Sequence, residues 1–317
     1  MMVPIVQVAV LVVLTHVFRA IVLFAGPRRS GLLMGLPSTT AVVLVCSGLE
    51  RGLPEATGAA EACLIGLVAA ASVPLVYARC VAARWPLPWI PCIAIAGYLG
   101  VAGVLRGVPA AGPWECVAVA VFGVVIACIL AQRRRKRSER FTAETVLESS
   151  PRLPRSSWIS RSAVPASYFL AVRGMRSLAG PNFAGMFITC PGTSLAVLVT
   201  THLEAGPGAA CRMAAAMPMG SLCMLSFLSV FRFGIPRLGL TWGTALAYLV
   251  ALATLFAVER ISRLHESIQG RRWLSRELRA ARTRFARFDP ALGWAITGRA
   301  SARRASRFLP IVERLAC

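Results

Sequence analysis

The sequence has very little acidic charge and almost no lysine. Asp289 is its only aspartate and Lys136 its only lysine, so arginine carries nearly all of the net charge of +22. Charged residues make up only 15% of the 317 residues, whereas 56% are hydrophobic. A chain with so few charges cannot cover a soluble domain, and we therefore predict a polytopic membrane protein. The arginine bias is typical of a GC-rich bacterial genome.

Catalytic and metal-binding motifs are also missing. The ten cysteines form no CxxC pair, and there is no phosphate-binding loop, GxSxG, HExxH or aspartate-rich metal signature. We therefore expect no enzyme activity, no cofactor and no metal site, although an enzyme acting on lipid through dispersed residues remains an alternative. The basic residues lie mostly after residues 132 and 258, beside hydrophobic stretches, which argues against nucleic-acid binding.

Hydrophobic runs dominate what is present. They fall at about 3–25, 31–49, 57–78, 87–105, 113–132, 163–179, 183–203, 213–231 and 238–258. Each is near the length that crosses a bilayer as a helix. The first run has no preceding basic residue and is too long for a cleavable signal. The predicted fold class is all-α, with about nine transmembrane helices.

Arginine placement predicts the orientation. The basic cluster that starts at Arg133 opens the linker 133–162, and further arginines fill the tail 259–317, so both segments should be cytoplasmic. Counting spans back from the linker puts the N-terminus outside and the C-terminus inside the bacterial inner membrane. One short loop disagrees, because Arg232 and Arg237 would lie outside.

The sequence also repeats itself at an offset of 154 residues without a gap. The residues that coincide include many that hydrophobicity alone does not align: Pro37 with Pro191, Thr39 with Thr193, Glu50 with Glu204, Gly52 with Gly206, and Gly66 with Gly220. Chance similarity between apolar segments is the alternative. The offset divides the chain into a first membrane repeat (1–112), an unmatched helix (113–132) and a second repeat (163–258). Because the unmatched helix reverses direction, we expect inverted repeats, and a direct repeat follows if one run is not a span.

Each repeat carries a proline followed by hydroxyl residues. These are Pro37, Ser38, Thr39 and Thr40 in the first copy, and Pro191, Gly192, Thr193 and Ser194 in the second. Proline removes a helix hydrogen bond, and a broken helix can present its backbone dipoles and hydroxyls to a substrate or ion. We name these residues as candidate substrate-binding residues. The alternative is an ordinary proline kink supported by threonine.

Charged residues within the spans are costly and point to function. The duplication retains Arg19 with Arg173 and Glu50 with Glu204, and inversion would let Arg19 pair with Glu204 and Arg173 with Glu50 across the repeats. These four residues are candidate charge pairs or gates. Alternatively they mark water interfaces and snorkel to lipid head groups. Glu61 and Arg176 are further ionisable positions, whereas His16 and His202 are not aligned by the repeat and favour an incidental role.

The tail predicts a separate partner. Leu264, Ile268, Leu274, Leu278 and Phe285 recur at near-helical spacing among arginines. This pattern favours a basic amphipathic helix that binds anionic lipids of the bilayer. A coiled-coil or partner helix is the alternative.

The spacing from Pro37 to Glu50 and on to Gly52, repeated from Pro191 to Glu204 and Gly206, resembles the small bacterial inner-membrane GlpM family. The likeness covers about one span in each copy. It implies a membrane location and a core like two such units fused, in a family linked to exopolysaccharide production without an established catalytic role. The long basic tail departs from that pattern.

Three functions therefore remain in view. The first is a secondary transporter or permease, with an unknown small-molecule substrate bound between the repeats and an anionic or carboxylate-bearing substrate favoured by the intramembrane arginines. The second is a non-catalytic envelope scaffold, for example in exopolysaccharide production. The third is the lipid-modifying enzyme.

Overall fold

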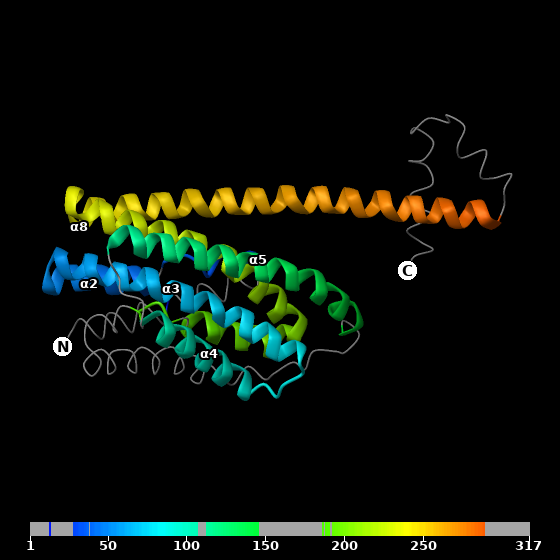
Figure 1. Ribbon diagram of the computed structural model, residues 1–317, viewed down its shortest axis with the longest axis horizontal. Coiled ribbons are helices and arrows are strands. Elements are labelled where there is room, and N and C mark those ends of the chain that lie inside the picture. The colour runs from blue at the N-terminus through cyan, green and yellow to red at the C-terminus, as the bar shows by residue number, and fades with distance from the viewer. Residues whose placement is uncertain are drawn as a thin grey trace, which may run out of the picture. The chain divides into compact units, whose positions relative to one another are not determined.

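The computed structural model describes residues 13, 28–37, 39–106, 112–145, 186, 188–190 and 192–288. Every regular element in these ranges is a helix (Figure 1). They are α2 (Thr39–Arg51), α3 (Leu53–Ala82), α4 (Trp89–Arg106), α5 (Pro113–Thr145) and α8 (Gly192–Phe288), and residues 28–33 form a further short helix. The predicted first and sixth spans, at 3–25 and 163–179, lie outside the described residues apart from Val13.

Long apolar helices confirm the membrane assignment. Within the described ranges, Leu53–Ala82, Pro113–Arg133 and Ala205–Leu264 are long and apolar enough to cross a bilayer, and Trp89–Leu105 and Ser194–Leu203 are shorter apolar helices. The chain is therefore an all-α membrane protein. The number of spans, predicted as nine, stays a prediction.

Two glycines divide α8 into three segments, 192–205, 207–238 and 240–288. Gly206 has φ 82° and ψ 170°, and Gly239 has φ 75° and ψ 173°, a backbone region that is essentially restricted to glycine. Gly52, which separates α2 from α3, has nearly the same angles, φ 92° and ψ 170°. Gly52 and Gly206 are 154 residues apart. Each therefore ends a helix of similar length and lets the chain turn directly into the next one.

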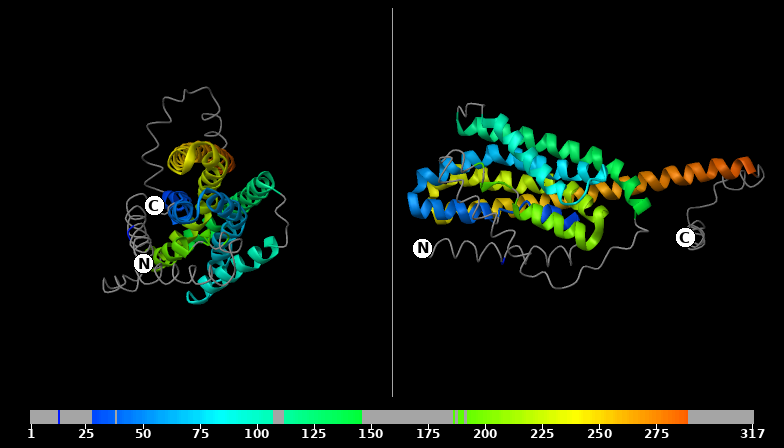
Figure 2. Two further views of the ribbon diagram at one scale, coloured as in Figure 1. Left: turned by 90° about the vertical axis from the view of Figure 1, so that its left-hand side faces the viewer. Right: turned by 90° about the horizontal axis from the view of Figure 1, so that it is seen from below.

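Helix α3 is the centre of the first half of the protein, residues 28–132. It contacts α2, α4 and α5, and Figures 1 and 2 show α2 and α5 running alongside it. Its buried side is made largely of small residues, which allows close approach of neighbouring helices. The second half, residues 186–259, supplies the remaining neighbours through α8.

Two boundaries differ from those predicted. Helix α5 continues to Thr145, so the start of the linker 133–162 is helical and extends the apolar span. Arg232 and Arg237 are not loop residues, because both lie within segment 207–238 of α8 and the turn comes at Gly239. Hydropathy alone missed this, since these arginines interrupt the apolar run but not the helix. Residues 1–259 and 260–317 form two compact units, and α8 ends at Phe288.

Candidate functional site

The chain leaves its helical path at the two proline-hydroxyl motifs. After the helix at 28–33, the Gly35 and Leu36 amides donate to the carbonyls of Leu32 and Leu33 at 3.1 and 3.0 Å in a tight turn, and α2 begins only at Thr39. In the second half, the Gly192 amide donates to the Cys190 carbonyl at 2.8 Å, where α8 begins. The run 31–49, predicted as one span, is therefore interrupted at its proline.

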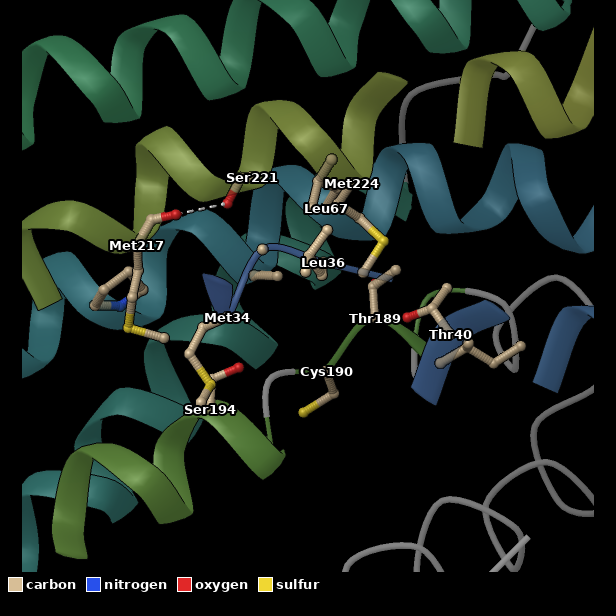
Figure 3. A pocket seen from close by; sticks show the side chains of 14 residues that line it. Met34, Leu36, Thr40, Leu67, Thr189, Cys190, Ser194, Met217, Ser221 and Met224 are labelled. Atoms are coloured by element: carbon tan, nitrogen blue, oxygen red, sulfur yellow. Dashed lines mark hydrogen bonds between the residues drawn. The ribbon is translucent and has the colours of Figure 1, made fainter. Parts of the chain in front are cut away.

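A cavity of about 70 Å³ lies where the two interruptions meet. This volume holds a few water molecules or a small ion. Figure 3 shows side chains from both halves around it. Its lining consists of Met34, Gly35, Leu36, Thr40, Leu67, Ala70, Pro74, Ile188, Thr189, Cys190, Ser194, Met217, Ser221 and Met224.

Two hydroxyls of this lining are equivalent under the 154-residue offset. Thr40 lies in the first turn of α2 and Ser194 in the first turn of α8, and both line the cavity (Figure 3). Thr40 is only 2% exposed, and within the described residues neither hydroxyl has a hydrogen-bond partner. The cavity therefore contains two polar groups that the described protein leaves free to bind a ligand.

Two helices also begin at this cavity. The first amide groups of a helix lack intrahelical partners, and the macrodipole places partial positive charge at that end. The other hydroxyls of the lining are engaged, because Thr189 Oγ1 donates to the Met186 carbonyl at 2.7 Å and Ser221 Oγ to the Met217 carbonyl at 3.3 Å. The described lining holds no charged side chain. Its electrostatic character is thus set by the helix ends and by Thr40 and Ser194.

Close backbone contacts around the cavity are reciprocal. A Cβ atom on Gly66 of α3 would lie 2.9 Å from the Met186 carbonyl oxygen, and one on Gly220 of α8 would lie 2.5 Å from the Leu32 carbonyl oxygen. Gly66 and Gly220 are 154 residues apart, and so are Leu32 and Met186. Each glycine therefore allows its helix to touch the equivalent turn of the other half. Reciprocal contacts of this kind are those of a two-fold interface.

Tyrosine hydroxyls also join the two halves, although they are not related by the offset, which matches Tyr98 with Leu252. Tyr98 of α4 donates its hydroxyl to the Met186 carbonyl at 2.5 Å, and Tyr248 of α8 donates to the Pro37 carbonyl at 3.0 Å. The two large apolar clusters also exchange under the offset. One contains Leu44, Ala60, Cys63 and Phe231, and the other contains the equivalent Leu198, Ala214, Met217 and Tyr77.

The equivalent long helices run in opposite directions. Glu61 of α3 forms an ion pair with Arg232 of α8, whose equivalent position in α3 is Ala78. Seventeen residues separate positions 61 and 78, which is about 25 Å along a helix. Equivalent helices running the same way about a two-fold axis would keep these positions far apart. Figure 1 likewise shows α3 and segment 207–238 crossing the bundle in opposite senses.

The named candidate residues divide into three groups. Thr40 and Ser194 line the cavity, while Pro37 is buried and accepts the Tyr248 hydrogen bond and Gly192 begins α8. Thr39 and Thr193 belong to the first turns of the same helices, but their side chains are outside the described part. Also outside the described part are Ser38, Pro191, Arg19, Arg173 and the Glu204 side chain. Glu50 is described, and it is exposed near the end of α2. The pairs Arg19–Glu204 and Arg173–Glu50 therefore stay predictions.

Two polar contacts between the halves were not anticipated. Glu61 pairs with Arg232, and the Tyr77 hydroxyl lies 3.0 Å from His202 Nδ1. An intramembrane glutamate is a visible signal for the first pair, but hydropathy predicts a loop at its partner Arg232. His202 carried no usable signal, because only the fold brings Tyr77, 125 residues away, to its ring.

No family model, curated protein or solved structure matches this chain. The resemblance to the GlpM family therefore stays a prediction, as does the expectation of no enzyme activity. Within the described residues, no group of three or more His, Cys, Asp or Glu side chains is placed to hold a metal ion. The function is consequently inferred from the cavity and its surroundings.

Proposed function

We propose that this protein is a permease of the bacterial cytoplasmic membrane, built from two inverted repeats with a substrate site in the cavity between them. The observation that carries the proposal is the pair of equivalent hydroxyls, Thr40 and Ser194, at two helix starts that face one cavity. Broken helices whose N-terminal ends meet between inverted repeats form the substrate sites of many secondary transporters.

The reciprocal contacts support the inverted repeat. Opposed equivalent helices about a two-fold axis require an axis perpendicular to them, which lies in the membrane plane when the helices span it. Arg29 and Glu259 pair at 3.5 Å, which sets the start of the first described helix beside the end of the membrane part of α8. The expected topology puts both of these ends inside. The pairing of Arg232 with Glu61 also accounts for one of the two arginines that disagreed with that topology.

The substrate class we propose is a small anion, such as a monocarboxylate. Helix N-termini attract negative charge, and hydroxyls can donate hydrogen bonds to oxyanions. A volume of about 70 Å³ has room for a small carboxylate. Arginine side chains are not required in the described lining, because the helix ends supply the positive potential.

Uptake by proteoliposomes tests this function. We expect purified protein to take up radiolabelled acetate faster than protein-free liposomes, and Thr40→Val with Ser194→Ala to reduce that rate about tenfold or more, since both hydroxyl donors of the site are lost. The matched control is Thr200→Val, because its hydroxyl donates to the Val197 carbonyl within its own helix. Equal uptake by the double variant and the wild type would remove the cavity from the pathway.

The scaffold alternative depends on a different observation, the continuation of α8 as a basic helix to Phe288. We expect a peptide of residues 263–288 to gain helicity on anionic vesicles and much less on neutral ones, with high salt weakening binding. Recovery of a stable protein partner that requires residues 264–317, together with no uptake of acetate, phosphate or chloride, would favour the scaffold over the permease.

A further inference from the structure

Two polar pairs between the halves lie on either side of the cavity along α3. The cavity residues of α3 run from Leu67 to Pro74. Glu61 precedes them by six residues and Tyr77 follows them by three, which places the two side chains about 9 Å and about 4.5 Å beyond the cavity along the helix axis. Glu61 contacts Arg232, and Tyr77 contacts His202, so each pair joins one half to the other at one end of the cavity.

The pair at the α2 end of α3 is ionic. The Glu61 and Arg232 side chains are 28% and 22% exposed, so most of each is removed from solvent. The Arg232 guanidinium also lies 5.8 Å from the centre of the Phe233 ring, and that ring stacks on Trp114 of α5 at 4.3 Å. Three helices therefore hold this ion pair in place.

The pair at the other end is a hydrogen bond. The Tyr77 hydroxyl lies 3.0 Å from His202 Nδ1 and 3.4 Å from the Leu198 carbonyl oxygen, and the two rings meet edge to face at 6.2 Å. His202 lies in the last turn of segment 192–205, and its side chain is half-buried. Cys211, from segment 207–238, is a titratable neighbour of the Tyr77 hydroxyl. Among the described residues, no charged side chain faces this contact.

Neither pair is repeated at the opposite end. The positions equivalent to Glu61 and Arg232 are Ala215 and Ala78, and those equivalent to Tyr77 and His202 are Phe231 and Gly48. Two ends that share a backbone design therefore differ in the chemistry that joins the halves there. A purely structural requirement would not need a different polar pair at each end.

Protonation of His202 would change its hydrogen bonds. With Nδ1 unprotonated, the Tyr77 hydroxyl donates to it. With both ring nitrogens protonated, Nδ1–H becomes a donor, Tyr77 accepts through its oxygen, and the Tyr77 hydroxyl proton turns to the Leu198 carbonyl. The proton comes from water on the side of that end, and the charged imidazolium then favours hydration of the contact.

We propose that Glu61–Arg232 and Tyr77–His202 are the two gates of the cavity and that His202 binds the proton that opens the second gate. This inference rests on the proposed function and adds its coupling ion. By the expected topology, the Glu61 gate faces outside and the Tyr77 gate faces the cytoplasm. One gate is held closed by an ion pair and the other opens when His202 is protonated. The cavity can therefore open to one side at a time.

Cys190 lines the cavity and reports its opening. The experiment measures alkylation of Cys190 by a membrane-impermeant maleimide, added to either side of sealed vesicles containing the full chain, with the labelled residue identified by mass spectrometry. Variants are compared at the same pH, so that the intrinsic pH dependence of thiol alkylation cancels.

We expect Glu61→Gln to raise Cys190 labelling from the outside at least about threefold at both pH 8 and pH 6, because the attraction to Arg232 is lost. For labelling from the cytoplasmic side, the quantity compared is the ratio of the wild-type rate to the His202→Gln rate at the same pH. We expect this ratio to rise at least about threefold from pH 8 to pH 6, the range in which imidazoles gain charge. Tyr77→Phe should also remove this pH response. Glu55→Gln is the matched control for Glu61→Gln, because Glu55 pairs at 3.4 Å with Arg51, whose side chain is 58% exposed and stays solvated when its partner is lost.

If Glu61→Gln and Tyr77→Phe expose Cys190 to the same side, or if His202→Gln keeps the wild-type pH response, the proposal is wrong. Should Glu61→Gln fail to fold, Glu61→Gln with Arg232→Gln retains the test without a lone charge. Labelling does not depend on transport. Sided, pH-dependent labelling without uptake of any tested anion would retain the gates and overturn the permease, whereas uptake without sided labelling would overturn the gates alone.

Discussion

The two ends of the cavity show how equivalent backbones can acquire different chemistry. Both ends are formed by a long helix from each half, and both contain a large buried aromatic residue, Phe231 at one end and Tyr77 at the other. One end adds the Glu61–Arg232 ion pair and the other adds a hydrogen bond to His202. In the proposed permease, the shared part sets the architecture and the unshared part distinguishes the two sides of the membrane.

The largest effect should come from separating the ion pair. Glu61→Ala or Arg232→Ala leaves a mostly buried charge without its partner, which we expect to lower the free energy of unfolding by about 3 kcal/mol. The double change Glu61→Ala with Arg232→Ala copies the alanines of the opposite end and should recover much of this loss. Thermal unfolding in detergent, followed by size-exclusion chromatography, measures it.

The control for this comparison is Glu55→Ala, which leaves only the solvent-exposed Arg51 of an i,i+4 pair without its partner and should cost less than about 0.5 kcal/mol. An equal loss for Glu55→Ala and Glu61→Ala would show that the ion pair at this end contributes no more than a surface contact.

The next effect concerns the shared close contacts. Gly66→Ala and Gly220→Ala each force a methyl group against the backbone of the other half, and we expect both to destabilise the protein by about 1–3 kcal/mol. Gly100→Ala is the matched control, because a Cβ there meets nothing within 4 Å and alanine favours the helix. If only one of the two cavity glycines is sensitive, the interface does not have two-fold character.

The helix turns should show a similar but smaller effect. Gly52 and Gly206 have positive φ angles near 90° and 80°, which an alanine adopts only with strain. We expect Gly52→Ala and Gly206→Ala each to lower the free energy of unfolding by about 1–2 kcal/mol. The loss would come from backbone strain alone, because neither new Cβ clashes with another atom. Matching losses in thermal unfolding would support equivalent turns in the two halves. A neutral Gly206→Ala would separate that turn from the one at Gly52.

Reporter fusions measure which side of the membrane a residue lies on, and they give the sharpest test of inversion. Fusions that end after Gly52 and after Gly206 should report opposite sides of the membrane, outside for the first and inside for the second. A fusion after Ser149 should report inside. The same side for Gly52 and Gly206 would establish a direct repeat in place of an inverted one.

Sequence periodicity predicted the helical stretches of α3, α4 and α5 well, because an apolar run of spanning length has few other structures available in a bilayer. The sequence also located the two proline-hydroxyl motifs. Thr40 and Ser194 of these motifs lie in the first turns of α2 and α8 and line one cavity. The sequence left open whether the chain breaks its helix there or only bends. The choice between a kink and a break depends on whether neighbouring helices satisfy the exposed backbone groups, and those neighbours come from the other half.

The sequence by itself determined the membrane class, the apolar helices and the 154-residue correspondence, because these depend on composition and on spacing along one chain. Only the tertiary structure decided which residues meet. Glu61 and Arg232 are separated by 171 residues, and Tyr77 and His202 by 125. Hydrophobic patterning specifies which face of each helix is buried, but the partner of a polar side chain depends on the direction and register of helices far apart in the chain. Those are set by close packing at positions such as Gly66 and Gly220, where a single methyl group would alter the contact.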